Sequence, residues 1–305
     1  MTDKIKIAAV VGPTAGGKTS LAVELAKRAD GEIICCDSMQ IYKQMKIGSA
    51  APTEEEKQGV PHHLFDFVPV DKNFSAAEYV PIARTAIEEI SSRGKLPILC
   101  GGTGLYLESL MYQSDYSPSV DPSIRDELQT KDDDTLYAML NEYDPESART
   151  IHKNNRKRVI RALEIYLGTG KTKTEWDALS RTKESIYDAR VFVLSYRDRE
   201  TLYERINRRV DIMFEMGLVD EVKGIDFPEG STAGDAIGYK ELREYFKGNI
   251  SLEQAKEDIK QATRRYAKRQ ITWFKREQSA IQLYADDYGN TDDIVNIVLN
   301  HLTNC

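Results

Sequence analysis

Hydrophobic and polar residues along the first 115 positions are spaced in a way that predicts strands and helices in turn. Three short apolar runs, "KIKIAAVV", "GEIICC" and "KLPILC", have the length of buried strands. The segments "TSLAVELAKR" and "LYLESLM" have helical spacing, and residues 75–94 predict a helix that ends at a glycine. Strands that alternate with helices in this way predict a parallel, doubly wound α/β sheet.

The pattern changes after residue 115. Residues 116–186 show helical spacing interrupted by Pro, Asp and Gly, without a convincing strand-like run. A strand is predicted again at "ARVFVLSYRD", followed by helices to about residue 280, a short strand at "AIQLYA" and a final helix. We therefore predict a P-loop α/β core formed by residues 1–115 and 187–305, interrupted by a helical insertion at 116–186.

The composition restricts where the protein acts. Its apolar runs are too short to span a bilayer, and the first of them leads directly into a glycine-rich loop, which is not typical of a signal peptide. The four cysteines have neither metal-site nor disulfide-framework spacing. These features predict a cytoplasmic protein with reduced thiols and no membrane association.

The charge is unevenly distributed. The net charge of −7 argues against a protein that coats nucleic acid along its whole surface. However, residues 149–164 contain six Lys or Arg, and residues 260–276 contain seven with no acidic residue. Such segments can bind a polyanion locally, although solvated helix faces show the same pattern. The charge pattern alone leaves both interpretations open.

The segment "GPTAGGKT" predicts a phosphate site. Gly12, Gly17, Lys18 and Thr19 match the pattern G-x-x-x-x-G-K-[ST], between a predicted strand and a predicted helix. Glycines allow backbone amides to converge on one anion, and the helix N-terminus adds partial positive charge. Lys18 adds a full charge, and the Thr19 hydroxyl can bind magnesium. The loop recognises a pyrophosphate group and does not by itself specify a nucleotide.

Asp37 ends the second apolar run, which places it at the carboxyl edge of the predicted sheet, where ligands bind in open α/β folds. It could hold magnesium, act as a general base toward an acceptor, or simply end a strand. The following "SMQIYK" supplies a hydroxyl, an amide and an aromatic ring, which suits an acceptor better than magnesium alone.

Two further segments follow strand-like runs and give weaker indications. In "GGTGLY" the glycines would let the backbone approach a ligand and Thr103 would point a hydroxyl into the site, although a tight turn explains them equally well. In "PHHLFD", His62, His63 and Asp66 are possible metal ligands, but adjacent histidines usually face different ways, which argues against a metal site.

A cluster of arginines is predicted on one helix. The segment "RINRRVDIMFEMG" contains Arg205, Arg208 and Arg209. An arginine there could stabilise a leaving phosphate, or the group could face solvent.

Taken together, these segments resemble the bacterial tRNA dimethylallyltransferases, also called tRNA isopentenyltransferases. The matching motifs occur in family order from about residue 7 to residue 276, nearly the whole chain. Gly16 stands where the family more often has serine, and the zinc-finger tail of eukaryotic relatives is absent, as expected of a bacterial enzyme. The motifs are "GPTAGGKT", "DSMQIYK", "PHHLFD", "GGTGLY", "RVIRALE", "AIGYKE" and "AKRQITWFKR".

The resemblance implies a specific reaction. Dimethylallyl pyrophosphate would donate its five-carbon group to the exocyclic amine of the adenine 3′-adjacent to the anticodon, in tRNAs that read codons starting with U. Pyrophosphate would leave, so the glycine-rich loop would hold a leaving group, and no nucleoside triphosphate need take part. Magnesium is the implied cofactor, tRNA is the implied partner, and a monomer is the default expectation.

The resemblance also implies residue roles. Asp37 would be the general base, while Lys18, Arg209 and a magnesium ion bound by Thr19 would stabilise the pyrophosphate. The residues expected to bind the pyrophosphate are Gly12, Pro13, Thr14, Ala15, Gly16, Gly17, Lys18 and Thr19. Those expected to contact the tRNA are Asp37, Ser38, Met39, Gln40, Thr103, Arg125, Arg158 and Arg161.

Three other functions agree with parts of the sequence. A small-molecule P-loop kinase would consume ATP and would not need the basic segments. An enzyme that prenylates free adenosine monophosphate would share the loop and Asp37 but make less use of the C-terminal basic helix. A nucleotide-gated RNA-binding module would bind tRNA without turnover, so that loss of Asp37 would leave it unaltered.

Overall fold

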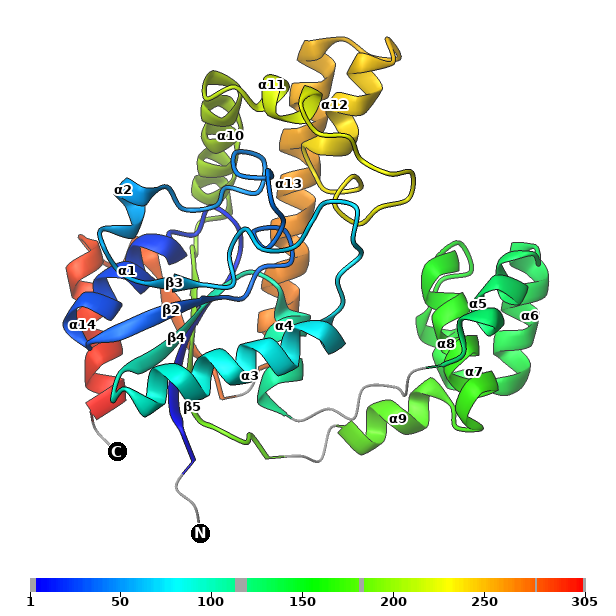
Figure 1. The fold of residues 1–305 in the computed structure, drawn as a ribbon, viewed down its shortest axis with the longest axis horizontal. Helices are drawn as coiled ribbons and strands as arrows, with labels where there is room; N and C mark the ends of the chain where they lie inside the picture. The colour runs from blue at the N-terminus through cyan, green and yellow to red at the C-terminus, as the bar shows by residue number, and fades with distance from the viewer. Residues whose placement is uncertain (1–3, 113–119, 181–183, 278, 304–305) are drawn as a thin grey trace. The chain divides into compact units, whose positions relative to one another are not determined.

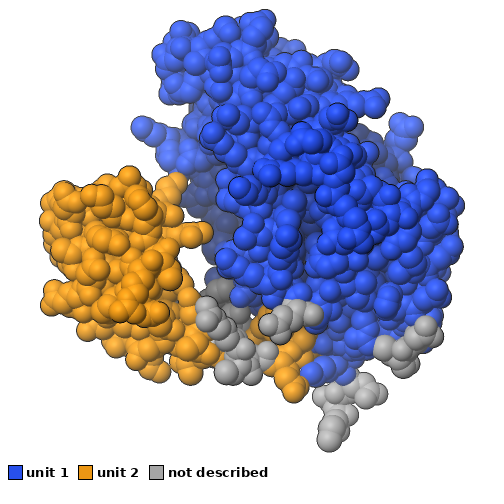
Figure 2. Space-filling model, turned by 180° about the vertical axis from the view of Figure 1, so that it is seen from behind, with its two compact units in different colours: residues 1–110, 187–305 blue, residues 111–186 orange. Residues whose placement is uncertain are grey.

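The computed structural model describes residues 4–112, 120–180, 184–277 and 279–303, which form two compact units (Figures 1 and 2). Unit 1 comprises residues 1–110 and 187–305, and unit 2 comprises residues 111–186. The boundary predicted after residue 115 lies among residues 113–119, which are outside the described residues. The second boundary of the structure, between residues 186 and 187, is where the chain returns to unit 1.

Unit 1 is built on a six-stranded sheet with the order β3-β2-β4-β1-β5-β6. All pairs are parallel, which confirms the predicted α/β class. The two-residue edge strand β3 was not predicted, because it is too short to show alternation. The strands are β1 (Lys6–Val11), β2 (Gly31–Cys35), β3 (His62–His63), β4 (Leu96–Gly101), β5 (Asp188–Ser195) and β6 (Ile281–Tyr284).

Helices α1 and α14 pack apolar faces against the sheet. The buried face of α1 includes Leu21 and Leu25, which pack with Val295 and Val298 of α14 against residues of the sheet. A second cluster joins the loop after β2 to α11, α12 and α13. The helices of unit 1 are α1 (Lys18–Arg28), α2 (Glu54–Lys57), α3 (Ala76–Ser92), α4 (Gly104–Met111, whose last residue belongs to unit 2), α10 (Arg199–Glu215), α11 (Leu218–Lys223), α12 (Tyr239–Phe246), α13 (Leu252–Phe274), the 3₁₀ turn η1 (Ala285–Asp287) and α14 (Thr291–Thr303).

The described part of unit 2 is helical. Three of its aspartates cap helices: Asp121, Asp132 and Asp144 each accept a backbone N–H at the start of a helix. Its core includes Leu140 and Leu163. The helices are α5 (Pro122–Gln129), α6 (Asp133–Tyr143), α7 (Pro145–Thr150), α8 (Arg156–Thr169) and α9 (Lys173–Ser180). No helix in the described parts of either unit is both long and apolar enough to cross a membrane.

The register of the central strands brings the predicted site residues to one edge. Val11 at the end of β1 is level with Gly101 at the end of β4, and Cys35 at the end of β2 is level with Cys100. The segments that leave these strands therefore begin side by side, and they carry the phosphate-loop motif, Asp37 and Thr103.

Candidate functional site

The carboxyl edge of the sheet is tightly packed where β2 and β4 end. The Cys36 N–H donates to the Cys100 carbonyl at 2.8 Å, and the Thr103 N–H donates to the Cys36 carbonyl at 3.1 Å. A Cβ on Gly101 would lie 2.0 Å from the Cys36 carbonyl oxygen. Only glycine fits this approach, which explains the first position of the "GGTG" turn.

The phosphate-loop motif forms the turn between β1 and α1. Gly12 has a φ of +138°, and a Cβ there would lie 2.2 Å from the Leu194 carbonyl oxygen of β5. Gly17 begins α1 with a φ of 90° and no side-chain cap. The first-turn amides of α1 therefore have no side chain capping them and can bind an anion.

Lys18 lies folded over the loop. Its Nζ donates to the Pro13 carbonyl at 2.7 Å. Burial lowers the pKa of Lys18 to about 8, while Cys100 and Asp37 oppose the shift and Arg209 adds to it. A negatively charged group bound in the loop would offset the free-energy cost of burying the Lys18 charge. The position of Lys18 therefore suits phosphate binding.

We expect the contribution of Lys18 to the affinity for inorganic pyrophosphate to be nearly constant below a pH of about 8, where Lys18 keeps its proton. Above that pH the lysine becomes neutral, and the affinity should fall by up to about tenfold per pH unit. Isothermal titration calorimetry across this range measures the effect. Lys18→Arg keeps its charge, so its profile should lose the decline. An equal decline in that variant would show that Lys18 is not the group that causes it.

Asp37 is fixed by the turn that contains it. Its Oδ1 accepts the Met39 N–H at 2.9 Å. The next amide, that of Ser38, donates to the Thr103 Oγ1 at 2.9 Å, and the Thr103 hydroxyl donates to the Ser38 Oγ at 3.2 Å. Thr103, which is predicted to contact the tRNA, holds the turn that carries Asp37.

Gln40 and Arg209 meet at one loop. The Gln40 Nε2 donates to the carbonyls of Ser49 and Ala50 at 3.2 and 2.9 Å. The Arg209 guanidinium donates to the same Ala50 carbonyl, at a longer 3.4 Å. Burial lowers the pKa of Arg209, and the negative charges of Glu56 and Asp37 oppose that shift. Arg209 is thus a weakly hydrogen-bonded cation in the electrostatic field of Asp37.

The neighbouring arginines have different surroundings. The Arg205 Nε donates to the Ala15 carbonyl of the phosphate loop at 3.0 Å, and its guanidinium lies over the Tyr196 ring. Arg208 is exposed. Of the three arginines considered from the sequence, Arg209 has the placement best suited to stabilise a charge near Asp37.

Glu221, which the sequence did not indicate, anchors the loop that holds Gln40 and Arg209. Its carboxylate accepts the N–H groups of Lys46, Ile47 and Gly48 at 3.0, 2.7 and 2.9 Å. It also accepts the Tyr239 hydroxyl at 2.7 Å. Of these groups, only Tyr239 lay in a recognised motif, "AIGYKE".

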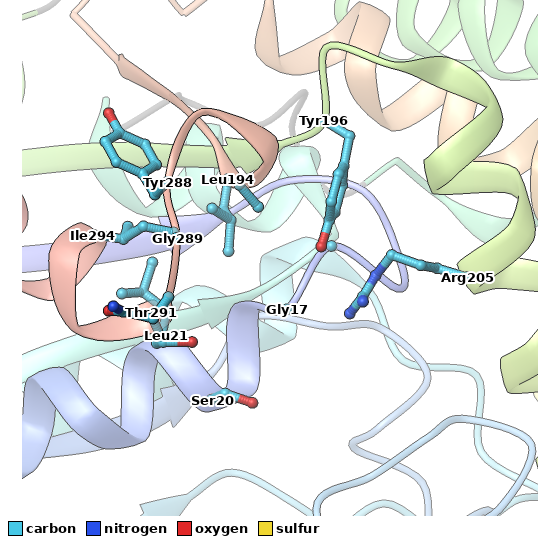
Figure 3. A pocket seen from close by; sticks show the side chains of 13 residues that line it. Gly17, Ser20, Leu21, Leu194, Tyr196, Arg205, Tyr288, Gly289, Thr291 and Ile294 are labelled. Atoms are coloured by element: carbon cyan, nitrogen blue, oxygen red, sulfur yellow. The ribbon is translucent and has the colours of Figure 1, made fainter.

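A pocket opens beside the phosphate loop (Figure 3). Tyr196 and Arg205 lie on one side of it and Tyr288 on the other, with Gly17 between them at the start of α1. The loop glycines therefore line a hollow on this side of the loop. Its lining residues are Gly16, Gly17, Ser20, Leu21, Leu194, Tyr196, Arg205, Ala285, Tyr288, Gly289, Asn290, Thr291 and Ile294.

The histidines of "PHHLFD" have structural partners. The His62 Nδ1 is 2.8 Å from the Val60 carbonyl oxygen, and the His63 Nε2 is 2.7 Å from the Glu32 carboxylate, which also pairs with Arg93. Among the described residues, no group of three or more His, Cys, Asp or Glu side chains is arranged to hold a metal. Both imidazoles are therefore engaged in hydrogen bonds within the protein.

The arginines predicted on the helical insertion lie within unit 2. Arg125 and Arg161 both pair with the buried carboxylate of Glu164. Arg158, on the same helix as Arg161, is exposed. Glu164 holds two of the three guanidinium groups in fixed positions and neutralises part of their charge.

Comparison with known proteins gives a consistent result. The family model for IPP transferase matches residues 40–277. The tRNA dimethylallyltransferase of Caldanaerobacter subterraneus subsp. tengcongensis is 46% identical over 98% of each chain. The full-length tRNA isopentenylpyrophosphate transferase of Bacillus halodurans has a similar structure, with a TM-score of 0.72, 41% identity and coverage of 98% of this chain and 97% of that chain.

A structure of a eukaryotic dimethylallyltransferase acting on tRNA is also similar, with a TM-score of 0.84 and 29% identity, over 98% of this chain and 80% of that chain. The phosphate loop and Asp37 precede the segment matched by the family model, but the alignment with the Caldanaerobacter enzyme spans nearly the whole of this chain. By the extent of these matches, the chain belongs to the IPP transferase family.

Proposed function

We propose that this enzyme transfers the dimethylallyl group of dimethylallyl pyrophosphate to the exocyclic amine of the adenine 3′-adjacent to the anticodon, in tRNAs that read codons starting with U. The observation that carries the proposal is the grouping of Lys18, Arg209 and Asp37. The charge of Asp37 raises the pKa of both Lys18 and Arg209 against the effect of burial, which supports a site that combines one carboxylate with two cations able to bind phosphate. This combination suits an anionic leaving group beside an acceptor that must lose a proton.

The reaction forms a carbon–nitrogen bond and breaks the carbon–oxygen bond to pyrophosphate. The adenine amine is a weak nucleophile, so Asp37 accepts its proton as the new bond forms. The electron pair of the broken bond leaves with the pyrophosphate oxygen. Lys18, Arg209 and the amides at the start of α1 stabilise that developing charge.

The residues at the loop fit a magnesium ion held mainly by the substrate. The Thr19 hydroxyl lies in the first turn of α1, next to Lys18, and among the described contacts no hydrogen bond engages it. Magnesium is commonly bound through one or two protein ligands together with substrate phosphates. Thr19 would hold the ion, which neutralises pyrophosphate charge when bound.

The tRNA side of the site uses the remaining predicted residues. Asp37, Ser38, Met39, Gln40 and Thr103 would surround the adenine, which must leave its stack to reach the carboxylate. Phosphate contacts from the basic face of α13, and from Arg125, Arg158 and Arg161 of unit 2, would position the anticodon stem-loop. Such an enzyme would act in the cytoplasm, and the proposal needs one copy of the chain.

Mass spectrometry of an anticodon stem-loop tests the function. The RNA is incubated with the chain, magnesium and dimethylallyl pyrophosphate, and a parallel reaction contains ATP instead. We expect a mass gain of one dimethylallyl group only with the prenyl donor, and none when the target adenine is replaced by guanine. ATP consumption with a small acceptor and no RNA adduct would instead establish a kinase.

A further inference from the structure

Gln270 of α13 is a buried polar residue, 4% exposed, that joins the two sides of the site. Its Oε1 accepts the Thr14 N–H of the phosphate loop at 2.9 Å. Its Nε2 donates to the Gly102 carbonyl of the "GGTG" turn at 2.9 Å. One side chain therefore links the phosphate loop to the "GGTG" turn that contains Thr103.

The close approach of Gln270 explains a second glycine. A Cβ on Gly102 would lie 2.1 Å from the Gln270 Nε2. One helical turn earlier, the Tyr266 side chain lies close to Thr103 and Gln270. Because Thr103 holds Ser38, the contacts from Gln270 continue to the turn that carries Asp37.

We propose that Gln270 is a positioning residue. It would set the phosphate loop, where the prenyl donor would bind, relative to the "GGTG" turn and Asp37, where the amine that accepts the prenyl group would bind. This inference rests on the proposed function for the identities of donor and acceptor. The bond that breaks in the donor must point at an amine held beside Asp37. A misplacement of about 1 Å in such an arrangement costs about 100-fold in rate.

The chemistry of the two partners requires an amide at this position. Thr14 presents a donor and Gly102 presents an acceptor, and a carboxamide matches both at once. A charged carboxylate offers only acceptors and would face the Gly102 carbonyl with like partial charge. A neutral carboxylic acid has nearly the shape of the amide and can again donate and accept.

α13 extends this role toward the RNA. The helix carries most of the basic residues of the 260–276 segment, while Gln270 is buried on its inner face. A helix that contacts RNA phosphates on its outer face would thus be hydrogen-bonded on its inner face to the loop that binds the donor.

Three variants test the inference by steady-state transfer kinetics over a range of substrate concentrations. Gln270→Met keeps the volume and removes both hydrogen bonds, and we expect it to lower kcat by about 10- to 100-fold with smaller changes in KM. Gln270→Glu should show a similar defect at pH 8 that diminishes as the pH falls, because burial favours protonation of the introduced carboxyl. Gln282→Glu, at an exposed position of the edge strand β6 and outside the basic segment, is the matched control and should behave like the wild type.

Amide hydrogen exchange at Thr14, without RNA or donor, provides a readout independent of transfer. We expect Gln270→Met to lose protection at Thr14 while its thermal unfolding stays cooperative. Wild-type kcat in that variant, or a Gln270→Glu defect that is equal at every pH, would overturn the inference. An inactive wild-type chain with a protected Thr14 amide would instead reject the proposed function, so the two failures are distinguishable.

Discussion

Asp37→Asn is expected to lower the rate of dimethylallyl transfer by about 10²- to 10⁴-fold, the usual contribution of a general base. The substitution is close to isosteric, and its amide oxygen can still accept the Met39 N–H that fixes the turn. The turn should therefore persist while the proton acceptor is lost. Single-turnover kinetics with a stem-loop RNA and dimethylallyl pyrophosphate measure the effect.

The control for this prediction is Asp71→Asn, at an exposed aspartate of the same unit, which should transfer at the wild-type rate. At pH values well below 8, where Lys18 keeps its proton, binding of inorganic pyrophosphate should change little in Asp37→Asn, because the loop amides and the Lys18 charge remain. A transfer rate within a few-fold of the wild type would exclude Asp37 as the base. It would favour a role for this carboxylate in electrostatics or in the turn alone.

The arrangement of the core was predictable because its signals are local. The apolar runs that became β1, β2, β4 and β5 are short and bounded by turn residues, and the helices between them have regular apolar spacing. The carboxyl edge followed from parallel topology, so the phosphate loop and Asp37 could be placed together before any coordinates. Strand β3 escaped prediction because two residues show no periodicity.

The residues that complete the site were not predictable because their partners are distant in the sequence. Gln270 contacts Thr14 across 256 positions, and Glu221 contacts Lys46 across 175. Gln270 lies in the recognised motif "AKRQITWFKR", but the motif does not indicate that this side chain is buried and hydrogen-bonded, and Glu221 lies in no recognised motif. Each is found only when packing brings an isolated polar side chain against the backbone of a loop.

The three arginines on α10 show the same limit at closer range. Their spacing predicted a shared helix but not which of them faces the site. The structure separates them, because Arg205 contacts the phosphate loop through Ala15, Arg208 faces solvent, and Arg209 lies near Asp37. A mutation series on this helix therefore has an internal control.

Arg209→Gln is expected to lower kcat for transfer by about 10²- to 10³-fold, as does removal of a comparable donor to a developing oxyanion. Among the residues that the structure describes, the guanidinium makes one hydrogen bond, a long one to the Ala50 carbonyl, so its remaining donors can serve the pyrophosphate. Since the charge grows as the carbon–oxygen bond breaks, the loss should appear mainly in kcat and less in the KM for either substrate. Arg208→Gln, one position away and exposed, should transfer normally. A larger defect in Arg208→Gln than in Arg209→Gln would contradict this prediction. It would indicate that the important arginine lies on the exposed face of α10 and contacts RNA phosphates.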